Sequence, residues 1–149
     1  MPPIEILTSR FGSVEIEPLD VICFPLGLLG LDGCSHWVLL ADAENDALGW
    51  LQSTSRSEIA LAVVSPRRFV PDYQVRVARS EIAPLSLDPA SDAHVLVIVS
   101  ASERLITLNL KAPLIINRQR RIGRQVIANG DQPLQYELFS DPSARKRSA

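Results

Sequence analysis

Alternation of apolar and polar residues with a period of two is the feature that most limits how this chain can fold. In residues 13–17, 73–79 and 106–111, apolar side chains occupy every second position. Val14 and Ile16, for example, are separated and followed by glutamates. Successive side chains of a strand point to opposite faces, so this pattern predicts strands with one face on a core and one in water.

Two further runs, 59–64 and 95–99, are apolar on both faces and rich in β-branched residues, which is typical of central strands. Residues 10–12 separate two strand-like runs at hairpin spacing. The best helix signal is one short turn at 80–85, where Ser80 precedes Pro84. We therefore predict an all-β, single-domain antiparallel β-barrel-like fold with at most one or two short helical turns.

Length and charge limit the possible functions. A chain of 149 residues is expected to form one domain and can bury a core without disulfides or metals. A net charge of -2 creates no field that would attract nucleic acid or an anionic membrane. The start of the chain lacks the pattern of a secretory signal, so we expect a cytoplasmic protein. We assign 1–140 to the barrel domain and expect the basic tail 141–149 to be disordered.

No pattern in the sequence nominates a reaction. A nucleophile elbow, a zinc-binding H-E-x-x-H and a phosphate loop are all missing, and Cys23 and Cys34 lie at no metal-ligand spacing. We expect structural or surface roles for His36 and His94. The three glycines of 27–33 alternate with leucines that would block the close approach of a phosphate. We expect no enzymatic activity, no metal and no cofactor.

One charge cluster stands out between the apolar segments 114–117 and 125–128. It consists of Arg118, Arg120, Arg121 and Arg124. The R-x-x-x-R spacing within it is also found in PilZ barrels that bind cyclic dinucleotides, but the companion polar motif of that family is missing. Three interpretations stay open: a solvated turn, a phosphate or RNA contact, and a contact with an acidic protein. A nucleotide- or RNA-binding barrel is therefore our alternative function.

Several stretches share a further pattern, in a fixed order. It runs through a T-x-R-F-G opening, an F-P-x-G-L-x-G-L loop, a W-L-Q-S step, an F-x-P-D-Y turn and an N-L-x-A-P-L-x-I-N segment. These stretches are 8-TSRFGSVEIE-17, 20-DVICFPLGLLGLDGCSHWVLL-40, 49-GWLQS-53, 60-ALAVVSPRRFVPDY-73 and 105-LITLNLKAPLIINRQRRIGRQVI-127. In these segments the chain resembles the FliW family of flagellar assembly factors. Leu108, Lys111 and residues 136–139 depart from the family pattern.

The resemblance implies a partner switch. Proteins of the FliW family bind newly made flagellin in the cytoplasm. When flagellin is exported, the freed protein binds the translational regulator CsrA, away from its RNA surface, and relieves the block on flagellin synthesis. The partners implied for this chain are flagellin and a CsrA-type regulator, with no membrane and no direct nucleic acid contact. We expect a monomer.

The apolar turns are the segments in which we look for the partner surface. Each either plugs a barrel end or forms a recognition patch. As contact residues we select Phe24, Leu28, Leu31, Asp32, Phe69, Asp72 and Tyr73. Aromatic side chains held by proline lose little entropy on docking, and the outward acids Glu15 and Glu17 would meet a basic partner.

Overall fold

The computed structural model describes residues 2–31, 33–88, 93–103 and 105–140. Asp32 and the tail 141–149 lie outside the described residues, so the expectations for them stay predictions. The strands are β1 (Ile4–Thr8), β2 (Gly12–Ile16), β3 (Val21–Cys23), β4 (His36–Ala41), β5 (Gly49–Ser53), β6 (Ala60–Val64), β7 (Ala93–Ala101), β8 (Leu105–Leu108), β9 (Leu114–Asn117), β10 (Ile122–Gln125) and β11 (Tyr136–Ser140). The short helical turns are η1 (Pro18–Asp20), η2 (Pro66–Arg68), α1 (Arg79–Ile82) and η3 (Ala83–Leu85).

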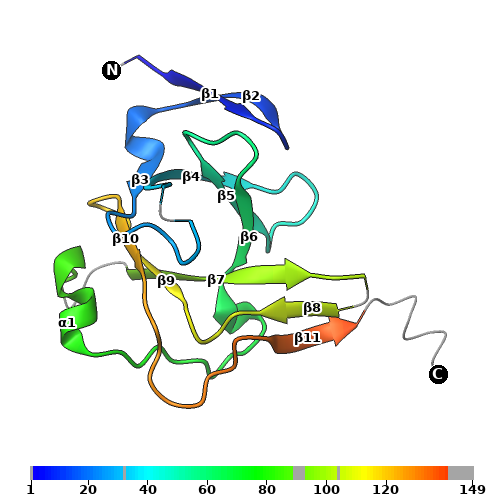
Figure 1. Ribbon diagram of the computed structural model, residues 1–149, viewed down its shortest axis with the longest axis vertical. Coiled ribbons are helices and arrows are strands. Elements are labelled where there is room, and N and C mark those ends of the chain that lie inside the picture. The colour runs from blue at the N-terminus through cyan, green and yellow to red at the C-terminus, as the bar shows by residue number, and fades with distance from the viewer. Residues whose placement is uncertain (1, 32, 89–92, 104, 141–149) are drawn as a thin grey trace.

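A closed sheet forms the body of the molecule (Figure 1). Around the ring the described strands follow the order β7-β6-β5-β4-β3-β10-β9, and pairing of β9 back onto β7 closes it. Neighbouring strands are antiparallel except β3 and β10, which pair in parallel at Cys23 and Ile122. Closure leaves no open edge in the ring. The predicted all-β barrel-like fold is confirmed.

The barrel interior is filled by large apolar side chains from strands on all sides. Trp37, Leu51, Leu114 and Ile116 are fully buried in one cluster with Phe24. The two apolar runs predicted as central strands lie in β6 and β7, except Ile59, which precedes β6. Because the interior is packed with side chains, the barrel is a solid core.

Outside the ring, β8 and β11 extend the sheet from the end of β7 (Figure 1). A second apolar cluster forms there, in which Val64, Val97 and Leu108 are buried. The segment that follows η2 packs against it through Phe69 and Val75. The molecule therefore has an inner core and an outer core on opposite sides of the same strands.

The β1–β2 hairpin forms a separate small sheet above β3, β4 and β5 (Figure 1). Its turn is ordered by Thr8, whose Oγ1 donates to the Gly12 carbonyl at 2.9 Å and accepts from the Phe11 amide at 2.8 Å. Gly12 has φ +72°, a left-handed conformation that completes three-residue hairpin loops. This explains why threonine and glycine flank the T-x-R-F-G turn.

The strand predicted at 73–79 is wrong. The segment alternates between more buried residues, such as Val75 and Val77, and exposed ones, but it has no ladder partner. It crosses the outside of the barrel with Tyr73 and Val75 in the outer cluster. Alternation indicates which side chains of an extended segment face a core. A single extended segment can turn alternate side chains toward the core without pairing with another strand.

Two strand ends also differ from the sequence prediction. β8 ends at Leu108 because the Asn109 side chain accepts hydrogen bonds from the amides of Lys111 and Ala112 and turns the chain. The apolar segment 125–128 overlaps a strand only at Gln125, because β10 starts at Ile122 and ends at Gln125. The helical turn predicted at 80–85 is present as α1 and η3.

Candidate protein-interaction surface

The loop between β3 and β4 closes one mouth of the barrel. Phe24 is 0% exposed and Leu28 2% exposed, and both belong to the inner core. Gly27 and Gly30 have φ values of +69° and +82°, which let the chain reverse twice within a few residues. A bridge between Leu28 and Leu31 holds the turn together. The buried members of this loop are therefore a plug for the barrel.

The plug is fixed against β10 by a close contact between a ring and a glycine. A Cβ added at Gly123 would lie 2.6 Å from the Phe24 Cζ atom. No real side chain occupies such a distance, so only glycine permits the Phe24 ring to lie on this strand. On the outer side, the Leu29 amide donates to the Gln125 Oε1 atom at 2.8 Å, and Gln125 Nε2 donates to the Ala112 carbonyl at 3.1 Å.

The same loop presents leucines to solvent. Leu26 is 69% exposed, Leu29 65% and Ile127, just beyond β10, 52%. With the loop backbone they surround a hollow of about 290 Å³. We call Leu26, Leu29 and Ile127 the barrel-end patch. Large aliphatic side chains gathered on a rigid base are typical of surfaces that contact other proteins.

An ion pair borders the barrel-end patch. Arg124 Nη2 lies 3.2 Å from Glu81 Oε2, and Arg124 Nη1 donates to the Glu81 carbonyl at 2.7 Å. Both side chains line the hollow. Because Arg124 on β10 binds α1 in this way, the pair also fixes α1 beside the patch. The arrangement is an apolar centre with polar groups at its rim, as in protein interfaces.

The residues selected from the sequence fall into three groups. Phe24, Leu28 and Tyr73 are buried in the two cores, so their side chains shape the loops and are not available to a partner in this fold. Leu31 and Phe69 are half-buried. Asp72 is exposed, and Asp32 is outside the described residues. In the first apolar loop, contact therefore falls to Leu26 and Leu29. Sequence alone cannot separate them from their neighbours, because the loop has no regular period.

Tyr73 has a structural partner. Its hydroxyl donates to the Leu110 carbonyl at 2.7 Å, and Arg67 Nε donates to the Tyr73 carbonyl at 2.9 Å. Burial raises the pKa of Tyr73 to about 12. The F-x-P-D-Y turn therefore ties the crossing segment to the chain after β8.

The arginine cluster is divided by the fold. Arg118 and Arg120 are exposed in the β9–β10 turn. Arg121 takes a left-handed conformation with φ +54° and donates through Nη2 to the Asp20 carbonyl at 2.8 Å. Arg124 is engaged by Glu81. Of the two arginines at the R-x-x-x-R spacing, Arg120 is exposed and Arg124 is already paired. This disfavours binding of one phosphate by both guanidinium groups.

The T-x-R-F-G turn and the W-L-Q-S step meet in space. The Arg10 guanidinium carbon lies 3.8 Å from the centre of the Trp50 ring, and Phe11 meets the same indole edge to face. Trp50 Nε1 donates to Asp42 Oδ1 at 2.9 Å. Cation–π and aromatic contacts of this kind stabilise by about 0.5–2 kcal/mol each. They attach the hairpin to the barrel.

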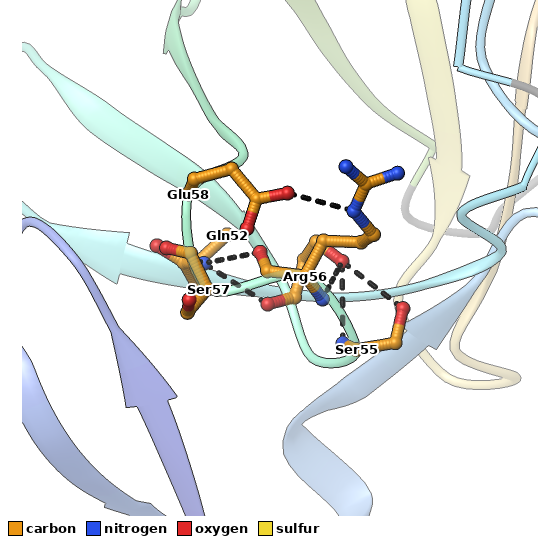
Figure 2. A network of polar contacts seen from close by, with 6 residues as sticks. Gln52, Ser55, Arg56, Ser57 and Glu58 are labelled. Carbon is orange, nitrogen blue, oxygen red and sulfur yellow. Dashed lines mark hydrogen bonds and ion pairs between the residues drawn. The ribbon is translucent and has the colours of Figure 1, made fainter.

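The glutamine of W-L-Q-S organises the turn that follows (Figure 2). Gln52 is buried, and its Nε2 donates to the carbonyls of Ser53 at 3.0 Å and Ser57 at 3.3 Å. The Ser53 hydroxyl oxygen accepts from the Arg56 amide at 3.0 Å, and Arg56 pairs with Glu58 at 2.7 Å. These contacts fix the β5–β6 turn, so the motif has a structural role.

Two further observations concern the described residues. No three side chains of His, Cys, Asp or Glu in these ranges lie close enough together to hold a metal ion. None of the helices within them has the length and apolarity needed to cross a membrane.

The fold and the patch define a small closed β-barrel protein that presents an aliphatic surface at one mouth. The family model described as FliW protein matches residues 5–138. The chain belongs to the FliW family.

Curated relatives and a solved structure agree with this assignment. The flagellar assembly factor FliW of Natranaerobius thermophilus is 31% identical and covers 97% of this chain and 99% of its own. That of Bdellovibrio bacteriovorus is 37% identical and covers 91% of this chain and 79% of its own. A crystal structure of the flagellar assembly factor FliW superimposes with a TM-score of 0.85 at 28% identity, over 91% of this chain and 97% of the other.

Proposed function

We propose that this chain is a non-enzymatic, cytoplasmic flagellar assembly factor that binds flagellin and, once flagellin has been exported, binds and antagonises a CsrA-type translational regulator. The single observation that carries the proposal is the barrel-end patch, which exposes Leu26, Leu29 and Ile127 on a rigid base. Membership of the FliW family indicates the class of function. The exposed aliphatic side chains of the patch are of the kind that bind other proteins.

The physical argument concerns what holds the patch in place. The Leu29 amide is bonded to Gln125, and the loop is anchored by the buried Phe24 ring against Gly123. Side chains on a preorganised backbone lose little entropy on docking, so their burial contributes to affinity. Burying apolar area stabilises a complex by roughly 25 cal/mol per Å². Exposed leucines on a fixed loop are therefore suitable anchors.

The outer face of the β1–β2 hairpin supports a basic second partner. Glu5 and Glu15 lie directly opposite each other in the hairpin, and both are exposed. Like charges in this position destabilise a sheet pair. A basic protein surface would relieve that repulsion and associate faster. Glu17 is also exposed, and its backbone amide donates to Asp20 Oδ2 at 2.8 Å at the start of η1.

The test is binding to purified flagellin on a sizing column and by calorimetry. Leu29→Asp should weaken binding by about tenfold or more, since a carboxylate would be desolvated in the interface. Leu134→Asp is the matched control, because Leu134 is 64% exposed and lies outside the patch. It should bind like the wild type. Equal binding by both variants, or no complex with flagellin or CsrA for the wild type, contradicts the proposal.

A further inference from the structure

A second apolar hollow lies on the outer core, away from the barrel-end patch. It encloses about 260 Å³ beside β5, β6, β7, β8 and β11, and of its lining residues all but Asn45 are apolar. Trp50, Phe69, Ala101 and Leu138 are among them. It shares no lining residue with the hollow of the barrel-end patch. We call it the outer hollow.

The outer hollow is open to solvent, and several of the side chains that line it are partly exposed. Phe69, Ile106 and Leu138 are half-buried and Ala101 is exposed, so the apolar walls are only partly covered. The strands that floor it are bonded to one another, which leaves recognition to side chains. An added strand would pair with the outer edge of β11 and extend the sheet beside the hollow, whereas an amphipathic helix inserts side chains into a groove.

One rim of the outer hollow is acidic. Asp42, Glu44 and Asp46 lie in the β4–β5 loop, whose Asn45 and Ala47 line the hollow. The hydrogen bond from Trp50, together with backbone amides of the loop, lowers the pKa of Asp42. This carboxylate is therefore ionised at neutral pH.

Two arginines offset part of this acidic charge. Arg10 stacks on Trp50, and Arg68 Nη2 lies 3.9 Å from Asp46 Oδ1. The exposed carboxylate of Glu44 adds to the acidic side. The rim as a whole therefore favours a cationic flank on whatever occupies the hollow.

We propose that the outer hollow docks an amphipathic helix of a partner protein, with aliphatic side chains in the hollow and lysine or arginine against the β4–β5 loop. An apolar cavity of about 150 Å³ holds a benzene molecule, so this one has room for one or two large side chains. Such anchors recur at i, i+3 and i+4 on one helix face. The inference goes beyond the proposed function, because it assigns a second surface that is separate from the barrel-end patch.

The test uses a synthetic peptide of leucine and lysine, about five turns long, arranged with one apolar helix face. Trp50 lines the hollow and Trp37 is fully buried, so a shift of protein tryptophan emission reports occupancy. Micromolar binding is expected. Ala101→Leu should fill the hollow and weaken binding by about tenfold or more, whereas Ala83→Leu, on an exposed alanine of η3, should leave it unchanged.

Further peptides and variants test the apolar contact and the charge contact separately. A peptide of the same composition in scrambled order, and one in which glutamate replaces lysine, should bind much more weakly. Glu44→Lys should weaken binding of the lysine peptide several-fold without changing the floor of the hollow. Binding that is equal in Ala101→Leu and wild type, or equal for lysine and glutamate peptides, overturns the proposal. A second filling variant, Ala47→Leu, serves if Ala101→Leu does not fold.

Discussion

At the scale of single residues, Tyr73 shows how a side chain in an apolar turn can belong to the core. Its hydroxyl bonds to the Leu110 carbonyl and its ring is buried. Tyr73→Phe should therefore lower the free energy of unfolding by about 1 kcal/mol near pH 8, the usual net value of such a bond. Urea unfolding measures this difference, with no change expected in flagellin binding.

The same variant gives a test by pH. Burial raises the pKa of Tyr73 from 10.0 to about 12. Between these values the unfolded chain loses the proton while the folded chain keeps it, so the folded state binds more protons and stability falls as pH rises. The stability from this group is complete below pH 10 and is lost through pH 12. The advantage of wild type over Tyr73→Phe should shrink in this window. A constant difference would contradict the assignment.

At the scale of elements, the contact between the plug loop and β10 is the critical one. Gly123→Ala would place a Cβ 2.6 Å from Phe24 Cζ, and the fully buried ring has no space to retreat. Overpacking of this kind typically destabilises by about 1–3 kcal/mol. Thermal and urea unfolding should show it. Gly33→Ala is the control, because a Cβ there meets nothing within 4 Å.

A double variant sharpens that test. Phe24→Leu combined with Gly123→Ala should recover part of the lost stability, because the smaller side chain gives the new methyl group room. The two single changes would then be non-additive, as expected for residues in contact. Strict additivity would show that the strain lies elsewhere.

The elements also show what sequence patterns reveal and what they do not. Two-sided apolar runs located β6 and β7 because a strand inside the barrel is covered on both faces. Alternation at 73–79 correctly marked Val75 and Val77 as facing the protein, but pairing depends on a neighbouring edge, which local sequence does not encode. Closure through β7 and β9 is a contact between distant segments, so no local pattern reports it.

The candidate site, too, could be predicted from the sequence only in part. The Gly/Pro-punctuated leucine loop could be singled out from sequence as an apolar turn. Its inward and outward leucines could not be separated, because two left-handed glycines at 27 and 30 set their directions. Only the fold brings Ile127 into the patch and Glu81 to its rim. The basic cluster, in contrast, is divided by Arg124 pairing with α1.

At the scale of the whole molecule, a packed barrel carries two apolar surfaces that share no residue. The barrel-end patch belongs to the plug loop and β10, and the outer hollow belongs to β8, β11 and the strands beside them. Separate surfaces would allow two partners to be distinguished without any pocket for chemistry. Competition between partners would then arise from overlap of the bound proteins or from a shared rim.

The most direct measurement is methyl cross-saturation by NMR, with labelled leucine and isoleucine methyl groups in this chain and unlabelled flagellin as partner. Saturation passes only to methyl groups in contact with the partner. The account predicts attenuation of Leu26, Leu29 and Ile127, with Leu7 and Leu134, which are equally exposed, left unchanged. Attenuation at Leu7 or Leu134 with none at the barrel-end patch would contradict it.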